Sequence, residues 1–118
     1  MTNLELGQKL RDAVEATDLD NILSNYFSED IESIEPAFTP LPHAKGIEQL
    51  KEKWNLFTGA IKEMHSKSVS KEVIVQGDLI VLGMSFDATF QDGNRMQLSE
   101  IIVYEVKDGK IISEQFFY

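Results

Sequence analysis

The chain contains no cysteine, and its three prolines all lie between residues 36 and 42. Without cysteine, disulfides, thiolate zinc sites and thiol nucleophiles are excluded. No hydrophobic run approaches the roughly 18 residues that a membrane-spanning helix needs, and the N-terminal residues lack the basic and apolar regions of a signal peptide. We therefore expect a cytoplasmic protein that does not insert into membranes.

Positive charge is also scarce: the chain has 11 lysines and arginines and 20 acidic residues, which gives a formal net charge of −9. The acidic residues are spread along the whole chain, so the protein should repel nucleic acids and anionic membrane surfaces. The two histidines, His43 and His65, do not show the paired spacing of a metal site. We expect neither a metal nor an organic cofactor.

Glycine occurs next to aspartate at three evenly spaced positions in the second half of the chain: Gly77, Gly93 and Gly109. Such pairs are typical of tight hairpin turns, where a residue with positive φ is required. Long alternating stretches without proline separate them, from about Met64 onwards. The pattern predicts four antiparallel strands, and strands of this length favour a curled sheet.

The first half of the chain has helical periodicity. Residues 6–14 predict one amphipathic helix, and a second should begin at the N-cap Asp18. Residues 28–35 alternate like a short strand, and the three prolines predict that residues 36–45 form a loop. A longer helix should begin at Gly46, with Lys53 and other charged residues facing water.

These elements predict one α+β domain over residues 1–118, with a curled antiparallel sheet wrapped around the N-terminal helices. A sheet of this shape encloses a pocket that suits a small apolar molecule. Strand alternation and the apolar stripe of the long helix predict which side chains surround that pocket. The predicted ligand-binding residues are Trp54, Met84, Phe86, Phe90, Leu98 and Tyr104.

Residues 18–26, 34–36, 46–50 and 104–111 resemble the nuclear transport factor 2-like superfamily, and within it the SnoaL-like group. The resemblance covers the whole chain. It implies the cystatin-like cone that ketosteroid isomerases also have, with a largely apolar internal pocket and a homodimer formed through the sheet. The superfamily includes isomerases, cyclases, dehydratases, hydrolases and proteins without catalytic activity, so the fold alone does not assign a reaction.

Glu35 is the first candidate catalytic residue, because it precedes Pro36 at the end of the short strand. Ketosteroid isomerases carry their Asp general base in the similar position, so the resemblance implies that Glu35 abstracts a proton. The alternative is a solvated turn residue.

Glu100 and His65 are the other two candidates. Glu100 falls on the apolar face of its predicted strand, where a carboxyl group must be protonated, paired or at the pocket opening. A β-bulge that turns it outward, or a structural ion pair, is the alternative. His65 shares the alternation of Val69, and if it points inward it could form a couple with Glu100 for acid and base chemistry. Otherwise it is a half-exposed side chain.

The first helix reads Lys9-Leu10-Arg11-Asp12 where ketosteroid isomerases carry an oxyanion-stabilising Tyr, so steroid-type isomerisation is disfavoured. With only two arginines, the Asp-Arg-Asp chemistry of the superfamily's epoxide hydrolases is disfavoured too. Two interpretations remain: a non-catalytic dimeric module that binds a small apolar ligand, or a cofactor-free isomerase or cyclase with Glu35 as the base. The incomplete catalytic set favours the first.

Overall fold

The computed structural model describes all 118 residues and has the predicted α+β architecture. Helices and strands follow in the order α1 (Asn3–Glu15), α2 (Leu19–Asn21), the π-helix η1 (Ile22–Tyr26), β1 (Phe27–Ile34), β2 (His43–Lys45), α3 (Gly46–Ala60), β3 (Ile61–Val69), β4 (Ile74–Gln76), β5 (Leu79–Phe90), β6 (Arg95–Lys107) and β7 (Lys110–Phe117). None of the helices has the length and apolar character that a bilayer-spanning helix requires.

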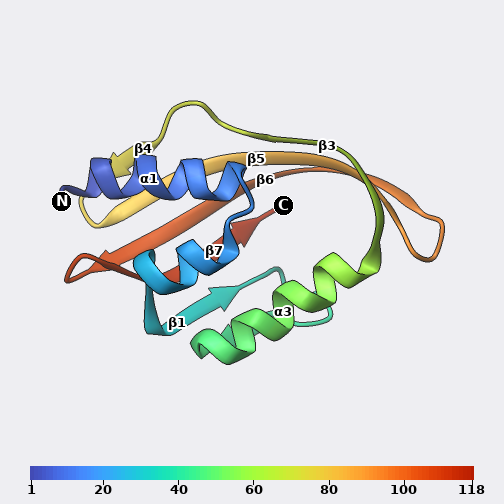
Figure 1. Ribbon diagram of the computed structural model, residues 1–118, viewed down its shortest axis with the longest axis horizontal. Helices are drawn as coiled ribbons and strands as arrows, with labels where there is room; N and C mark the ends of the chain where they lie inside the picture. The colour runs from blue at the N-terminus through green and yellow to red at the C-terminus, as the bar shows by residue number, and fades with distance from the viewer.

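The seven strands form one open sheet in the order β2-β1-β7-β6-β5-β3, and the short β4 also pairs with β5. Every pairing is antiparallel except that of β1 with β7. The long strands β5 and β6 bend along their length, as Figure 1 shows. Helix α1 packs against β3, β4 and β5, whereas α3 packs against β1 and β2.

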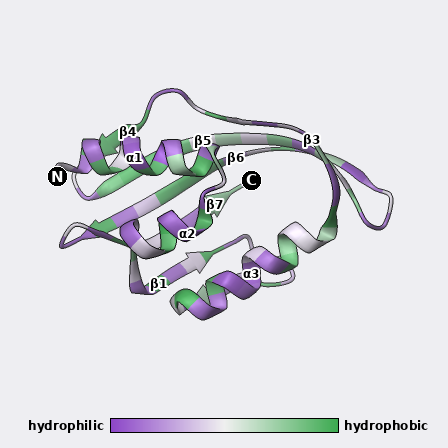
Figure 2. Ribbon diagram, viewed as in Figure 1, coloured by the Kyte–Doolittle hydropathy of each residue, from purple (hydrophilic) through white to green (hydrophobic).

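Helix α1 begins with a capping box that fixes its first turn. The hydroxyl of Thr2 accepts a hydrogen bond from the backbone N–H of Glu5, and the Glu5 carboxylate accepts one from the Thr2 N–H in return. Hydrophobic and hydrophilic segments alternate along α1 in Figure 2. Its apolar face, which carries Leu6 and Leu10, is buried against the sheet.

The predicted hairpin turns are confirmed at the glycine positions. Between β6 and β7, Asp108 and Gly109 both have positive φ, 52° and 76° respectively. Two consecutive residues of this kind match the right-handed twist of the flanking strands. Because an aspartate tolerates this conformation at modest cost and glycine at none, the Asp-Gly pair fixes the register of the longest strand.

The alternation predicted for β5 and β6 also agrees with the structure. Ile80, Leu82 and Phe86 of β5 are buried, and they pair in register with Tyr104, Ile102 and Leu98 of β6. Four of these side chains, Ile80, Leu82, Ile102 and Tyr104, belong to one hydrophobic core beneath α1 and α3. Its buried members are Leu6, Leu10, Ala13, Ile22, Leu23, Phe27, Ile31, Leu50, Ile80, Leu82, Ile102, Tyr104, Val106 and Ile111.

Two sequence-based expectations about the elements are wrong. Residues 36–45 are not loop throughout, because His43–Lys45 form β2 and pair with residues 32–34 of β1; the last proline, Pro42, precedes this strand and removes no hydrogen bond from it. The first strand of the meander is also not continuous. It breaks at residues 70–73, where the Ser70 hydroxyl accepts a hydrogen bond from the Gly83 N–H, and resumes as β4.

Candidate functional site

Two adjacent cavities lie between the inner face of the sheet and the helices. The first cavity, about 420 Å³, reaches from Val14 and Thr17 at the end of α1 to Tyr104 and Glu114 on the sheet. The second cavity, about 370 Å³, lies beneath the proline-containing segment and includes Glu35 and Glu100. Hydrophobic residues account for 13 of the 17 that line the first cavity and for 11 of the 16 that line the second, so both suit apolar molecules.

Five side chains line both cavities and form the boundary between them: Trp54, Phe57, Met84, Phe86 and Phe116. Phe57 of α3 meets the edge of the Phe86 ring of β5, with ring centroids 5.6 Å apart. Met84 is a flexible side chain that adapts to irregular shapes. Rotation of these few side chains would therefore join the two cavities into one elongated site.

The six side chains predicted to bind a ligand all line these cavities. Trp54, Met84 and Phe86 belong to both, Tyr104 belongs to the first, and Phe90 and Leu98 belong to the second. Their arrangement follows from the strand alternation described above. Their role in binding remains a prediction.

Lys53 of α3 organises a cluster of polar side chains at the inner edge of the second cavity. Its Nζ lies 2.8 Å from Glu35 Oε1 and donates a hydrogen bond of 2.5 Å to Ser33 Oγ. Ser33 donates in turn to Glu114 Oε1, at 2.8 Å, and the Lys53 ammonium also lies 4.5 Å from the centre of the Phe116 ring. The single cation therefore contacts Glu35, which follows β1, and is connected through Ser33 to Glu114 of β7.

The expectation that Lys53 faces water is wrong, since only 9% of this residue is exposed. Lys53 lies three residues after Leu50 and four before Phe57, which places it inside the apolar stripe of α3. Its position in that stripe was the available signal. A lysine there has to find an acceptor, and the sheet supplies Glu35 and Ser33.

Glu35 lines the second cavity, as the sequence predicts, but it is not a free carboxylate. Besides the Lys53 ammonium, it accepts a hydrogen bond of 2.7 Å from the Tyr118 hydroxyl. The two contacts occupy one oxygen of the carboxylate each. Burial and this hydrogen bond both raise the pKa of Tyr118, so its hydroxyl keeps its proton.

Glu100 is the buried carboxyl group without a partner. It is 8% exposed, lines the second cavity, and makes no hydrogen bond or ion pair with the protein. Burial raises the pKa of Glu100 to about 7, helped by the Glu35 carboxylate and opposed by Lys53. Near neutral pH this group is therefore present in both protonation states, which suits either donation to a ligand or acceptance from it.

Glu114 is a functional candidate that the sequence did not single out. It is 2% exposed and lines the first cavity, and burial raises its pKa to about 7 against the opposing effects of Lys53 and Ser33. Its alternation with Phe116, two residues later, was the signal that could have identified it. Each cavity thus contains one carboxyl group that titrates near neutrality.

The structure does not bring His65 to Glu100. His65 Nε2 lies 2.7 Å from Thr89 Oγ1, on the outer side of β5, and His65 lines neither cavity. The pairing of β3 with β5 is irregular between Met64 and Ser66, so His65 falls at a bulge and the alternation is shifted there. Met64 before the bulge and Lys67 after it line the first cavity, and Lys67 keeps the alternation of Val69.

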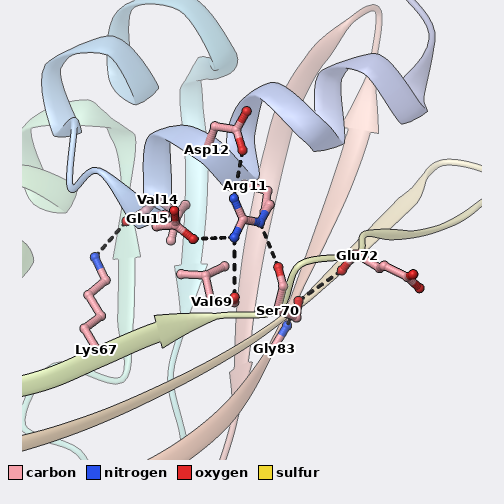
Figure 3. Close-up of polar contacts among 9 residues, drawn as sticks. All are labelled: Arg11, Asp12, Val14, Glu15, Lys67, Val69, Ser70, Glu72 and Gly83. Carbon is pink, nitrogen blue, oxygen red and sulfur yellow. Dashed lines mark hydrogen bonds and ion pairs between the residues drawn. The ribbon is translucent and has the colours of Figure 1, made fainter.

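The rim of the first cavity is held by contacts between the end of α1 and β3 (Figure 3). Arg11 contacts the carboxylates of Asp12 and Glu15 and donates to the backbone oxygen of Ser70 at 2.8 Å. Lys67 donates to the backbone oxygen of Val14 at 2.7 Å. No group of three His, Asp or Glu side chains anywhere in the chain is arranged to hold a metal ion.

Comparisons with known proteins agree with one another on the family and the fold of this chain. The model of the family described as SnoaL-like domain matches residues 1–118, whereas no curated protein matches the chain. A candidate SnoaL-like polyketide cyclase from Mesorhizobium loti is 31% identical, with full coverage of both chains and a TM-score of 0.91.

Two more distant structures share the fold. A protein of unknown function with a cystatin-like fold from Xanthomonas campestris is 15% identical, covers 99% of this chain and 90% of its own, and has a TM-score of 0.84. A Catenulispora acidiphila protein with a ketosteroid isomerase-like fold, in complex with trimethylamine, is 18% identical, covers 99% and 87%, and has a TM-score of 0.68. At these identities the likeness shows the fold alone.

Proposed function

This chain belongs to the SnoaL-like domain family, which includes cyclases and isomerases, and on that premise we propose that it binds a small, largely apolar organic molecule. The observation that carries the proposal is the pair of apolar cavities that share Trp54, Phe57, Met84, Phe86 and Phe116. An apolar molecule gains about 2.5 kcal/mol for each 100 Å² of surface that it removes from water. The enclosed aromatic boundary supplies such burial.

The polar groups of the second cavity restrict the ligand further. Glu100 has no partner in the protein, so a ligand that buries this carboxyl group must supply a hydrogen bond. A carbonyl oxygen accepts from the protonated acid, and a hydroxyl group donates to the carboxylate. The proposed ligand therefore carries one carbonyl or hydroxyl group on an apolar skeleton.

Titration with the fluorescent apolar probe N-phenyl-1-naphthylamine tests the binding proposal. We expect saturable binding to the wild type and loss of binding in Met84→Trp, because the larger ring fills the boundary between the cavities. Lys107→Trp, on an exposed position of β6, is the matched control and should bind as the wild type does. Equal binding by Met84→Trp and Lys107→Trp would contradict the proposed site.

A second candidate function is cofactor-free proton transfer on the bound carbonyl compound, and the presence of both Glu100 and Lys53 in the lining of one cavity favours it. The Glu100 carboxylate would take a proton from the carbon next to the carbonyl group. The electron pair of the broken C–H bond would move to the carbonyl oxygen, where the Lys53 ammonium stabilises the enolate. Return of the proton from Glu100 to the same or a conjugated carbon completes exchange or isomerisation.

Glu35 remains the alternative base, although its contacts with Lys53 and Tyr118 make it the weaker one. The two candidate bases are distinguished by NMR, which measures how fast the hydrogens next to the carbonyl group of 2-tetralone exchange for deuterium in D₂O with catalytic amounts of protein. If Glu100 is the base, Glu100→Gln abolishes the catalysed exchange and Glu35→Gln only weakens it. If the wild type exchanges the ketone no faster than buffer without protein does, the protein is a binding module.

A further inference from the structure

Lys67 is a partly buried cation that has no carboxylate partner. Its Nζ donates to the Val14 backbone oxygen and to Thr17 Oγ1, each at 2.7 Å, and forms no ion pair. Burial lowers the pKa of Lys67, against the opposing charge of Glu15. Several other lysines also form no ion pair, but they are exposed to solvent, whereas Lys67 is partly buried beside the first cavity.

The same ammonium group lines the first cavity. A lysine has three N–H donors, and the end of α1 uses two of them. Thr17 also lines this cavity, and its hydroxyl accepts from Lys67, so the hydroxyl hydrogen is free to donate elsewhere. Thr17 has a φ of 55°, which is rare for a β-branched residue, and this backbone conformation places its hydroxyl beside Lys67.

No acidic group in the first cavity neutralises Lys67. The only acidic residue of that cavity is Glu114, and it belongs to β7, whereas Lys67 belongs to β3. Strands β6 and β5 lie between them, so the two strands are about 14 Å apart at the usual strand spacing. Glu114 is instead bound to Ser33 beside Lys53.

We propose that the first cavity binds the acid group of the ligand: the ligand is an amphiphilic monoanion, with an apolar body inside the cavity and a single carboxylate or sulfonate held by Lys67 and Thr17. The proposal rests on the proposed binding function and adds the charge of the ligand to it. The free N–H of Lys67 and the hydroxyl of Thr17 supply two donors for one anionic group. Since burial strengthens a charge-assisted hydrogen bond, the acid group binds more tightly at this partly enclosed rim than it would on an exposed surface.

Lys67 has a structural role as well, because a lysine at the end of a helix satisfies the last carbonyl groups and favours the helix dipole. Figure 3 shows its contact with Val14 at the end of α1. An experiment has to separate this capping role from recognition of an anion. Two naphthalene probes that differ only by a sulfonate group make that possible.

The test is a fluorescence titration with 8-anilino-1-naphthalenesulfonate and with its neutral counterpart, N-phenyl-1-naphthylamine. Lys67→Met should weaken binding of the sulfonate about tenfold or more, because it loses a charge-assisted hydrogen bond, and should leave the neutral probe within about twofold. Lys67→Arg should restore most of the sulfonate affinity. Lys62→Met removes the same charge from an exposed position of β3 and should change neither probe.

Each other outcome has a definite meaning. If Lys67→Met weakens both probes equally, Lys67 only supports the helix and the proposed anion site is wrong, while the binding function stands. If Lys62→Met weakens the sulfonate as much as Lys67→Met does, the effect is one of overall charge and the site is again wrong. If neither probe binds the wild type, the proposed binding function fails and the anion site fails with it.

Discussion

Replacing Glu100 with glutamine should stabilise the protein at alkaline pH and leave it almost unchanged at acidic pH. The variant keeps the shape of the side chain but cannot ionise. Burial raises the pKa of Glu100 from 4.5 to about 7. The native protein therefore binds this proton in a range where the unfolded chain has already released it.

The sign follows from proton linkage. Between pH 4.5 and about 7 the native state holds more protons than the unfolded state, so the free energy of unfolding falls as the pH rises through this interval and levels off above it. A shift of roughly 2.5 pKa units corresponds to about 3 kcal/mol. The wild type loses this free energy of unfolding because it must keep a charged carboxylate in the apolar second cavity. Glu100→Gln has no charge to bury and avoids the loss.

Urea unfolding of the wild type and the variant at pH 5 and pH 8 measures the effect. Glu100→Gln should exceed the wild type by about 3 kcal/mol at pH 8 and by less than about 1 kcal/mol at pH 5. Glu105→Gln, exposed on the same strand, is the matched control and should change the stability little at either pH. The reasoning is refuted if Glu100→Gln gives the same stability difference at both pH values.

Two further predictions concern the polar cluster and the outer face of the sheet. Lys53→Met should lower the unfolding free energy by about 3 kcal/mol at pH 8 in urea unfolding, because Glu35 and Glu114 lose their only cation; an unchanged stability would show that the cluster does not depend on Lys53. We also propose that the protein is a homodimer through the outer sheet face, where Ile101 and Phe117 pair side by side and are 51% and 50% exposed. Sedimentation should then show a dimer for the wild type and a 13.4 kDa monomer for Ile101→Lys, whereas a wild-type monomer at micromolar concentration would contradict the dimer.

The sequence predicted most of the fold because local chemistry determines it. Asp-Gly turns, strand alternation and the helical apolar stripes specify the order of the elements, and the family resemblance is confirmed over the whole chain. The break between β3 and β4 was missed because it depends on a hydrogen bond from Gly83 to Ser70, which are distant in the sequence. Short-range patterns carry no information about such a contact.

The candidate site was only partly predictable, for the same reason. The cavity position of Glu100 follows from alternation, since β6 pairs regularly with β5 there, and Glu35, just beyond the end of β1, continues the alternation of the buried Ile31 and Ser33. His65 was misplaced because it falls at a bulge in β3, and alternation alone does not reveal a bulge. Lys53 and Glu114 were missed because a charged side chain was taken to face water, although the apolar stripe of α3 and the alternation of β7 place both inside, where Ser33 contacts them.

A crystal structure of the protein soaked with 2-acetylnaphthalene, a neutral apolar ketone, tests the central claim most directly. We predict that the naphthalene rings lie against Trp54 and Phe86, with the ketone oxygen within hydrogen-bond distance of the Glu100 carboxyl group. Clear density for the ketone on the outer face of the sheet, with both cavities unchanged, would contradict the account.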